Sequence, residues 1–302
     1  MGSSIEVAVE PLAPQHLADA AAMFAVGYPE RAHEFERWPS GDPAARWGAV
    51  VAAELVGYAG LWCVHGDRFR FDLVVAAGWR RCGVASRMLQ HIIADPHATG
   101  AATLQARAAD DNAPALAFLA RHGFAETMRM HRAVLDVTRF QLPAGAADAE
   151  RQLATAGIAI APLRELERSD RQCWERLRDV HHATQDGWRD PDPRPSPLAP
   201  LTTDEVRSRF QRNDRELGYE TAFVALAGDR YVGFTGSSGT GVHPAFRNRG
   251  IALALKVRQI AAAKALGVPA FHTSSGNPAM LRVFDKLGYV RTTTEIRLVR
   301  WL

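Results

Sequence analysis

Apolar positions along the chain follow two spacings, which predict strands and helices in mixed order. Residues 4–9 alternate between apolar and polar as a strand does, and residues 11–23 carry an alanine-rich apolar stripe at helical spacing. Further strands are predicted over 48–53, 55–63, 68–75, 101–106 and 128–137, and further helices over 85–94 and 113–121. Hairpin strands followed by alternating helices and strands predict an α/β fold, a central mixed sheet flanked by helices.

Two short phrases of the first half recur in the second half in the same order. Residues 75–85 read VAAGWRRCGVA and residues 242–252 read VHPAFRNRGIA, so the two copies align without a gap. The second phrase opens with Asn and closes with Gly and an aromatic residue, over 112–124 and again over 277–289, at nearly the same separation as the first. Two phrases that recur at nearly one offset indicate a tandem duplication.

The length of 302 residues suits two domains of ordinary size. Periodicity is lost after residue 138 and returns near 158, so we predict domains over 1–140 and 157–302 with a linker over 141–156. The second domain should have a shortened motif strand or lack a sheet edge, because only six residues separate 231–235 from Val242. Five prolines between 186 and 200 predict an extended loop. With Trp174, Trp188 and its acidic residues, this loop is either a lid for a cationic substrate or a stiff surface segment.

Composition narrows the classes of function. The chain is 47% apolar and 23% charged, as in globular proteins, and its net charge of +3 is too small and too scattered to indicate nucleic-acid binding. Three cysteines at irregular spacing form neither a disulfide framework nor a metal pattern. The chain starts without a signal-peptide pattern and has no apolar run of the roughly 18 residues that a membrane span needs. We therefore expect a cytoplasmic protein without a metal.

The first phrase has the chemistry of an anion-binding turn. Its Arg-x-x-Gly-x-Ala pattern lies between a predicted strand and a predicted helix, where unpaired backbone N–H groups and the helix dipole favour a phosphate. Gly83 and Gly250 allow a tight turn, while Ala85 and Ala252 keep bulk away from a bound group. The alternative is a glycine that only starts a helix beside solvated arginines.

The two phrases together, with the closing pairs Gly123-Phe124 and Gly288-Tyr289, resemble the GNAT acyltransferase superfamily over nearly all of both halves. The resemblance implies two tandem GNAT-like domains that bind acetyl-CoA, whose pantetheine arm pairs with the strand ending at Val75 or Val242 and is bonded or oriented by Asn112 or Asn277. It implies that the pyrophosphate lies on one of two turns, formed by Arg80, Arg81, Cys82, Gly83, Val84 and Ala85, or by Arg247, Asn248, Arg249, Gly250, Ile251 and Ala252.

The resemblance also implies direct transfer of the acyl group to an amine deprotonated by a base. Asp72, on the predicted strand before the first turn, is the candidate base of the first half; a surface residue or a partner of Arg70 is the alternative. His243 and His272 are the candidates of the second half, against the alternative of ordinary core or surface histidines.

The tyrosine that many family members place four residues before the closing Gly, as donor to the thiolate, is replaced by Leu119 and Phe284. The second turn, with Pro244, matches the family better, whereas the first contains Cys82 but has the better base. One catalytic half and one structural half are therefore expected.

We thus predict an acetyl-CoA-dependent N-acetyltransferase acting on a small-molecule primary amine, such as an aminoglycoside-like antibiotic or an amino sugar, without a nucleic-acid or membrane partner. Two alternatives remain open. One is a catalytically silent acyl-CoA-binding sensor or scaffold, and the other is acetylation of a thiol-bearing amino sugar conjugate, as in mycothiol synthases. A homodimer is also left open.

Overall fold

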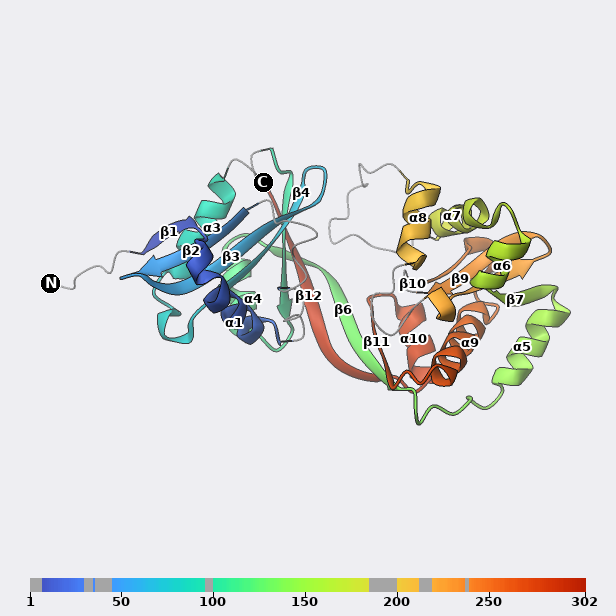
Figure 1. The fold of residues 1–302 in the computed structure, drawn as a ribbon. Helices are drawn as coiled ribbons and strands as arrows, with labels where there is room; N and C mark the ends of the chain where they lie inside the picture. The colour runs from blue at the N-terminus through green and yellow to red at the C-terminus, as the bar shows by residue number, and fades with distance from the viewer. Residues whose placement is uncertain are drawn as a thin grey trace. The chain divides into compact units, whose positions relative to one another are not determined.

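The computed structural model of the chain describes residues 7–29, 35, 45–95, 100–184, 200–211, 219–236 and 239–302. These residues form two compact units (Figure 1). The first unit takes the described residues up to Thr127 together with Arg297–Leu302, and the second takes those between Met128 and Ile296. The predicted domain boundaries concern the repeats along the chain, and they stay a prediction.

The first unit is built on antiparallel strands that continue into one parallel pair. Its strands are β1 (Ala8–Pro11), β2 (Ala45–Val51), β3 (Glu54–His65), β4 (Arg68–Val75) and β5 (Thr103–Ala109). Neighbours from β1 to β4 are antiparallel, and β4 pairs with β5 in parallel. The predicted mixed sheet is thus confirmed.

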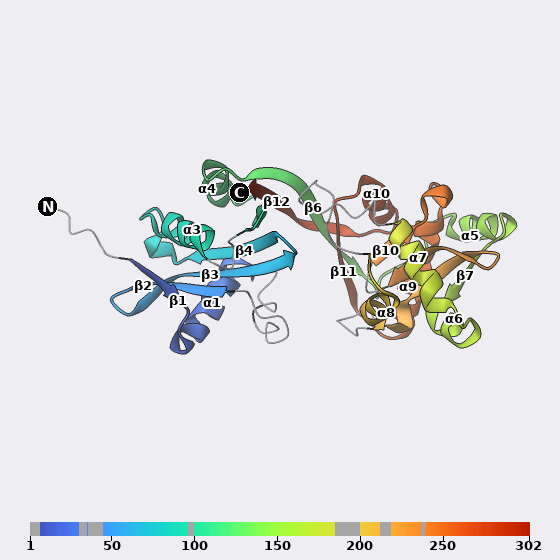
Figure 2. The same cartoon turned by 90° about the horizontal axis from the view of Figure 1, so that it is seen from above.

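Helices cover both faces of this sheet. Figure 2 shows α1 (Leu17–Gly27) on one face and α3 (Val84–Ala94) on the other. Adjacent residues of β3 point to opposite faces: Tyr58 packs edge-on against Phe24 of α1, whereas a side chain at Gly57 would meet Met88 of α3. The helix predicted over 113–121 is α4 (Ala113–Arg121).

The second unit repeats this plan with a shorter sheet. β7 (Ile158–Pro162), β8 (Phe223–Ala227), β9 (Arg230–Gly236) and β10 (Gly239–Val242) form a four-stranded antiparallel sheet. β10 has four residues where β4 has eight, which confirms the predicted shortening. The helices are α5 (Ala146–Thr155), α6 (Leu163–Ser169), α7 (Cys173–Ala183), α8 (Thr203–Gln211), α9 (Ile251–Ala265) and α10 (Pro278–Lys286).

Two apolar clusters cover the two faces of this sheet. Side chains of α6, α7 and α8 form one of them with residues of the sheet, and it includes Val180, Phe210 and Phe234. Side chains of α5 and α9 form the other, in which Leu153 and Leu255 contact the sheet. Trp174 lies in the first cluster, 7% exposed, and its indole N–H donates to Glu167 at 2.9 Å, so it belongs to the core rather than to a lid. Trp188 lies outside the described residues, as does most of the proline-rich segment.

Each unit also contains a strand that comes from the other half of the sequence. β6 (Ala125–Asp136) begins in the first unit, but its last six residues pair with β11 (Ala270–Ser275) in the second. β12 (Val290–Trp301) ends in the first unit, where the N–H of Leu302 donates to the carbonyl of Ala102 at 3.2 Å. The sequence does not indicate this exchange of strands.

Helix α5 lies within the stretch that was predicted to be a linker. Its only large apolar residue is Leu153, which is 3% exposed, and Glu150 forms an ion pair with Arg258 of α9. One large apolar residue in ten gives no helical period to detect, so the sequence did not indicate this helix; the linker between the repeats stays a prediction.

Candidate functional site

The two Arg-x-x-Gly-x-Ala turns have matching backbone conformations. Gly83 (φ 84°) precedes α3, and Gly250 (φ 83°) precedes α9. Two residues earlier, Arg81 (φ 66°) and Asn248 (φ 63°) also adopt the left-handed region, which non-glycine residues rarely do. Left-handed residues in such a turn direct successive N–H groups toward one side and form an anion-binding concavity. The predicted turns are therefore present in both halves.

Space is open on the outer side of both turns. A Cβ built on Gly83 or on Gly250 would meet no heavy atom within 4 Å. In α3, the first N–H group with a helical hydrogen bond is that of Arg87, which donates to the carbonyl of Gly83 at 3.1 Å. In α9 it is that of Ala254, which donates to the carbonyl of Gly250 at 3.1 Å. Hence the N–H groups of the preceding turn, which includes Val84 and Ala85 in α3 and Ile251 and Ala252 in α9, have no partner within the helix. A pyrophosphate would supply the acceptors that these donors lack.

The first arginine of each turn is attached to the strand before it. Arg80 Nε donates to the carbonyl of Val75 at 3.1 Å, and Arg247 Nε donates to that of Val242 at 3.2 Å. These bonds fix the guanidinium groups at the strand ends, which the sequence did not indicate. Arg249 lies over the ring of Phe246, 5.1 Å from its centre, and Cys82 is an exposed free thiol.

Strands β4 and β5 separate after a short paired segment. They pair from Arg68 with Thr103 to Arg70 with Gln105, so the last five residues of β4 extend beyond the paired segment. In the second unit, the described partner of β10 is β9, and that of β11 is β6. A strand edge of this kind can pair with an extended ligand.

The two predicted asparagines cap helices. The side chain of Asn112 accepts from the N–H of Ala115 at 3.2 Å, and that of Asn277 accepts from the N–H of Ala279 at 2.9 Å. Both residues are exposed, and capping uses the amide oxygen. A contact of their amide N–H groups with a ligand stays a prediction.

Asp72 lies on β4 and is completely buried. Its carboxylate is 3.8 Å from Nη2 of Arg107, whose side chain is 13% exposed. The predicted base therefore lies beside Arg107 of β5 and is not the surface residue that one alternative proposed. Its catalytic role remains a prediction.

The two candidate histidines of the second half lie in different surroundings. His243 Nδ1 is 3.2 Å from the N–H of Ala245, and its Nε2 is 2.8 Å from Nη2 of Arg230. A neutral imidazole has one acceptor nitrogen, so these two donors compete for it and leave no lone pair for an amine proton. Burial, Arg230 and Arg247 lower the pKa of His243. His272 is an exposed residue of β11. The surroundings of His243 do not favour a base, and both assignments stay predictions.

A histidine that the sequence did not single out lies beside the first turn. His122 Nε2 is 3.1 Å from the hydroxyl of Ser86, in the first turn of α3. Burial, Arg121 and Arg300 lower the pKa of His122, which favours its neutral form at pH 7. No spacing in the sequence could have indicated this pair, because α4 must pack on α3 to form it.

A buried polar cluster distinguishes the second repeat from the first. Lys256, 5% exposed, donates from Nζ to Gln259 Oε1 at 2.9 Å, and the same oxygen accepts from the Thr235 hydroxyl at 3.0 Å. Burial lowers the pKa of Lys256 to about 8. Alignment of the two turns places Leu89 and Ile92, both fully buried, at the positions of this lysine and glutamine in the first repeat.

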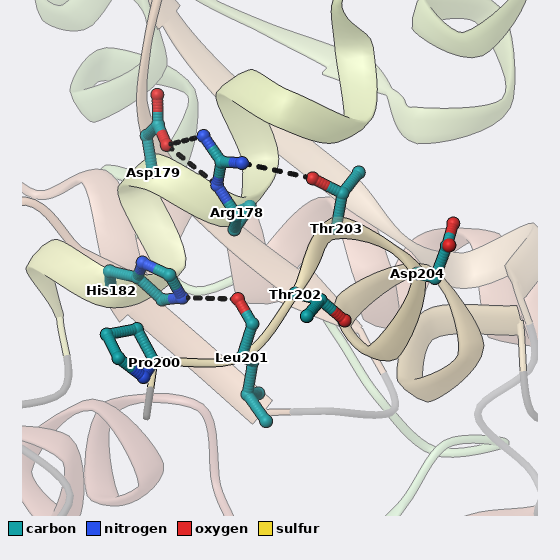
Figure 3. Close-up of a pocket in the computed structure, with 8 residues that line it drawn as sticks. All are labelled: Arg178, Asp179, His182, Pro200, Leu201, Thr202, Thr203 and Asp204. Carbon is teal, nitrogen blue, oxygen red and sulfur yellow. Dashed lines mark hydrogen bonds and ion pairs between the residues drawn. The ribbon is translucent and has the colours of Figure 1, made fainter. Parts of the chain in front are cut away.

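A shallow cleft of 590 Å³ lies in the second unit between α7 and α8 (Figure 3). Arg178 in its wall donates to Asp179 and to Thr203, and His182 Nε2 lies 2.9 Å from the carbonyl of Leu201. None of the predicted site residues lines this cleft.

Within the part of the chain that the structure describes, no group of His, Cys, Asp and Glu side chains could hold a metal ion. None of the described helices is long and apolar enough to cross a membrane.

A strand edge that leads into an anion-binding turn at the start of a helix is the arrangement that the resemblance to GNAT acyltransferases implies for acyl-CoA binding. Residues 16–124 match the acetyltransferase (GNAT) family. This match, over about a third of the chain, supports the predicted class of enzyme, a GNAT N-acetyltransferase. No curated protein shows a significant sequence match to the chain.

Three solved structures show the same fold across 98% of this chain. A GCN5-related N-acetyltransferase from Sphaerobacter thermophilus is 16% identical, with a TM-score of 0.70 and 95% of its own length covered. A tandem GNAT protein from the clavulanic acid biosynthesis pathway is 16% identical, with a TM-score of 0.63 and 98% covered. A glucosamine N-acetyltransferase region of a fungal multi-domain β-N-acetylglucosaminidase is 14% identical, with a TM-score of 0.74 and 38% of that chain covered. The predicted GNAT fold is confirmed.

Proposed function

We propose that the protein transfers the acetyl group of acetyl-CoA directly to a primary amine of a small molecule. The observation that carries this proposal is the pair of matching turns. Each has two left-handed residues, open space over its glycine and an arginine attached to the preceding strand. Both sets of donors suit the negatively charged pyrophosphate of the acetyl-CoA substrate.

We further propose that the first half is the catalytic one. β4 extends five residues beyond its pairing with β5, which gives the arm of the substrate an edge along which it can lie. Asp72 is on this same segment and would accept the amine proton, directly or through water. In the second half, β10 has four residues, carries no carboxylate, and is followed by a histidine that faces two donors.

The acceptor that we propose is a small amine such as an amino sugar or an aminoglycoside-like antibiotic. The structural similarity to a glucosamine N-acetyltransferase region makes an amino sugar the first compound to test. We also propose that the protein acts in the cytoplasm, where the exposed thiols of Cys63 and Cys82 would stay reduced.

The alternative of a silent acyl-CoA sensor is favoured by one observation. Leu119 and Phe284, at the positions where many relatives carry a tyrosine, are buried at 5% and 3% exposure. Neither side chain can donate a proton, and neither half has a replacement in α4 or α10 at this position.

Calorimetric titration of acetyl-CoA into the wild type, Gly83→Glu and Gly250→Glu tests the proposal, together with thiol release in the presence of amines. Glutamate at either position places a carboxylate where the pyrophosphate would bind. Gly145→Glu is the matched control, because Gly145 also precedes a helix, has φ 78° and is surrounded by open space. We expect Gly83→Glu to abolish turnover and Gly145→Glu to leave it unchanged.

The contrary results have separate meanings. Turnover that is lost only in Gly250→Glu would move the catalytic site to the second half. Binding of acetyl-CoA without turnover on any amine would support the sensor, and absence of binding to the wild type would refute the proposal.

A further inference from the structure

Among the described residues, the part of β4 beyond Arg70 pairs on one edge, with β3. The N–H of Ala76 donates to the carbonyl of Val56 in β3 at 2.9 Å. Because hydrogen-bonded residues alternate along an antiparallel pair, the backbone groups of Leu73 and Val75 point away from β3. Leu73 lies three residues beyond Arg70, the last residue of β4 that pairs with β5. Its N–H and carbonyl therefore face the gap between the two strands.

A phenol lies at this edge. The N–H of Leu73 donates to the hydroxyl oxygen of Tyr28 at 3.4 Å, and the Tyr28 hydroxyl donates to the carbonyl of Leu73 at 3.4 Å. Two residues further along the edge, the carbonyl of Val75 accepts from Arg80 of the anion-binding turn. An extended ligand with its phosphates on that turn would run back along this edge toward Leu73 and would reach the Tyr28 hydroxyl.

The position of Tyr28 depends on the close packing of α1 against β4. A Cβ on Gly27 would lie 2.6 Å from a methyl group of Val74, so α1 can approach the strand this closely only with glycine at its end. Tyr28 follows directly, and its N–H donates to the carbonyl of Phe24 at 2.8 Å. Its ring packs on that of Phe24 at a distance of 4.9 Å between centres. The ring contact with Phe24 and the close approach of α1 to β4 hold the hydroxyl at the strand edge.

We propose that Tyr28 is the catalytic acid of the first half, an inference that rests on the proposed function. The amine nitrogen forms a bond to the thioester carbon, the C–S bond breaks, and its electron pair goes to sulfur. The phenolic proton of Tyr28 moves to that sulfur, and the proton lost by the amine returns to the phenolate through Asp72 or solvent. Protons and charge balance without any other reactant.

Tyr28 thus replaces, from α1, the donor that Leu119 of α4 lacks. The same alignment of the two turns places Thr240 at the position of Leu73 in the second repeat, and its hydroxyl contacts Thr235 at 2.7 Å. The two halves therefore differ at the place where the thiolate would form.

The test compares the wild type with Tyr28→Phe in the full chain. With protein in excess over coenzyme A, the thiol of the bound molecule is alkylated at a series of pH values and the product is quantified by mass spectrometry. A phenol that donates to sulfur stabilises the thiolate, so its loss should decrease the ionisation constant of the bound thiol at least tenfold, whereas affinity for acetyl-CoA should stay within twofold. With an accepted amine, kcat should fall by about 10²-fold or more, and the alkaline decline in its pH profile should disappear.

Tyr289→Phe is the matched control, because it removes a phenol, buried at 6% exposure, from the second unit. An unchanged thiol ionisation constant in Tyr28→Phe would refute the inference. So would a loss of acetyl-CoA binding confined to that variant, since Tyr28 would then only position β4. A shifted thiol without turnover on any amine would refute the amine transfer and leave Tyr28 as the donor to sulfur. A wild type that does not bind coenzyme A would refute both.

Discussion

Replacing Lys256 by leucine, the residue at the matching position of the first repeat, should stabilise the protein at neutral pH. Lys256 is 5% exposed, and its Nζ bonds to Gln259, a neutral acceptor. Burial alone lowers its pKa from 10.5 to about 8, because the charged form is taken out of water without an anionic partner.

The magnitude follows from this shift. One pKa unit corresponds to 1.36 kcal/mol, so keeping Lys256 charged in the folded state opposes folding by about 3 kcal/mol. The variant also loses the bond to Gln259, which contributes on the order of 1 kcal/mol, although Thr235 still donates to the same oxygen. The net expectation at pH 7 is a gain of about 2 kcal/mol, or roughly 4–8 °C in the Tm of the second unit.

The pH dependence gives the sign of the effect. Below pH 8 the lysine is protonated in both states, so the full penalty is present. Between about pH 8 and 10.5 the folded protein releases the proton while the unfolded chain retains it, and stability rises with pH. The stability advantage of Lys256→Leu should therefore be constant below pH 8 and disappear by about pH 10.5.

Urea denaturation at pH 7, 9 and 10.5, followed by circular dichroism and by tryptophan fluorescence, measures this difference. Lys286→Leu is the control, because it removes the same charge from an exposed position of α10 and should change stability by less than about 0.5 kcal/mol. A Lys256→Leu variant that is less stable than the wild type by the same amount at every pH would refute the reasoning. It would show that the ammonium group has a favourable partner in the folded state.

Three further predictions concern the first unit. Acetyl-CoA should slow the alkylation of Cys82, which lies in the turn, at least tenfold, whereas Cys63, which is exposed outside the turn, should react at its original rate. If Cys82 were alkylated equally fast with and without acetyl-CoA, the substrate would lie on the other turn. Gly27→Ala should destabilise the protein by about 1–3 kcal/mol in urea, because its Cβ would overlap Val74, and unchanged stability would show that α1 is loosely packed. Arg107→Met should destabilise the protein by about 1–3 kcal/mol, because it leaves the buried carboxylate of Asp72 without this cation. Adding Asp72→Asn should recover most of this loss. Additive losses in the double-mutant cycle would show that the two side chains are not coupled.

The sequence predicted those features that depend on short-range spacing. The two turns follow from glycine, arginine and small residues at fixed offsets, and the structure places left-handed residues at Gly83 and Gly250. The helix over 113–121 follows from its apolar period and from the glycine that ends it. The shortened strand before Val242 could be read from the number of residues available. Local chemistry determines each of these features.

Features that depend on packing between distant segments could not be predicted. Tyr28 contacts Leu73 only because α1 approaches β4 at Gly27, and no motif relates residues 45 positions apart. The partner of Asp72 is Arg107, on a strand that is its neighbour in space rather than in sequence. The exchange of β6 and β12 is equally hidden, because each strand has an ordinary apolar pattern whichever unit it completes.

The two repeats have diverged in opposite directions, and this bears on which half is the enzyme. The second repeat keeps the closer match to the family turn, including Pro244, but its motif strand is short and it buries Lys256 where the first repeat has a leucine. The first repeat accepts a cysteine in its turn yet keeps a long strand edge with Asp72 and Tyr28 beside it. A turn can bind pyrophosphate through backbone groups and tolerate such a side chain, whereas proton transfer requires specific side chains at the thioester. We therefore give the side chains more weight than the turn in our proposal that the first half is the catalytic one.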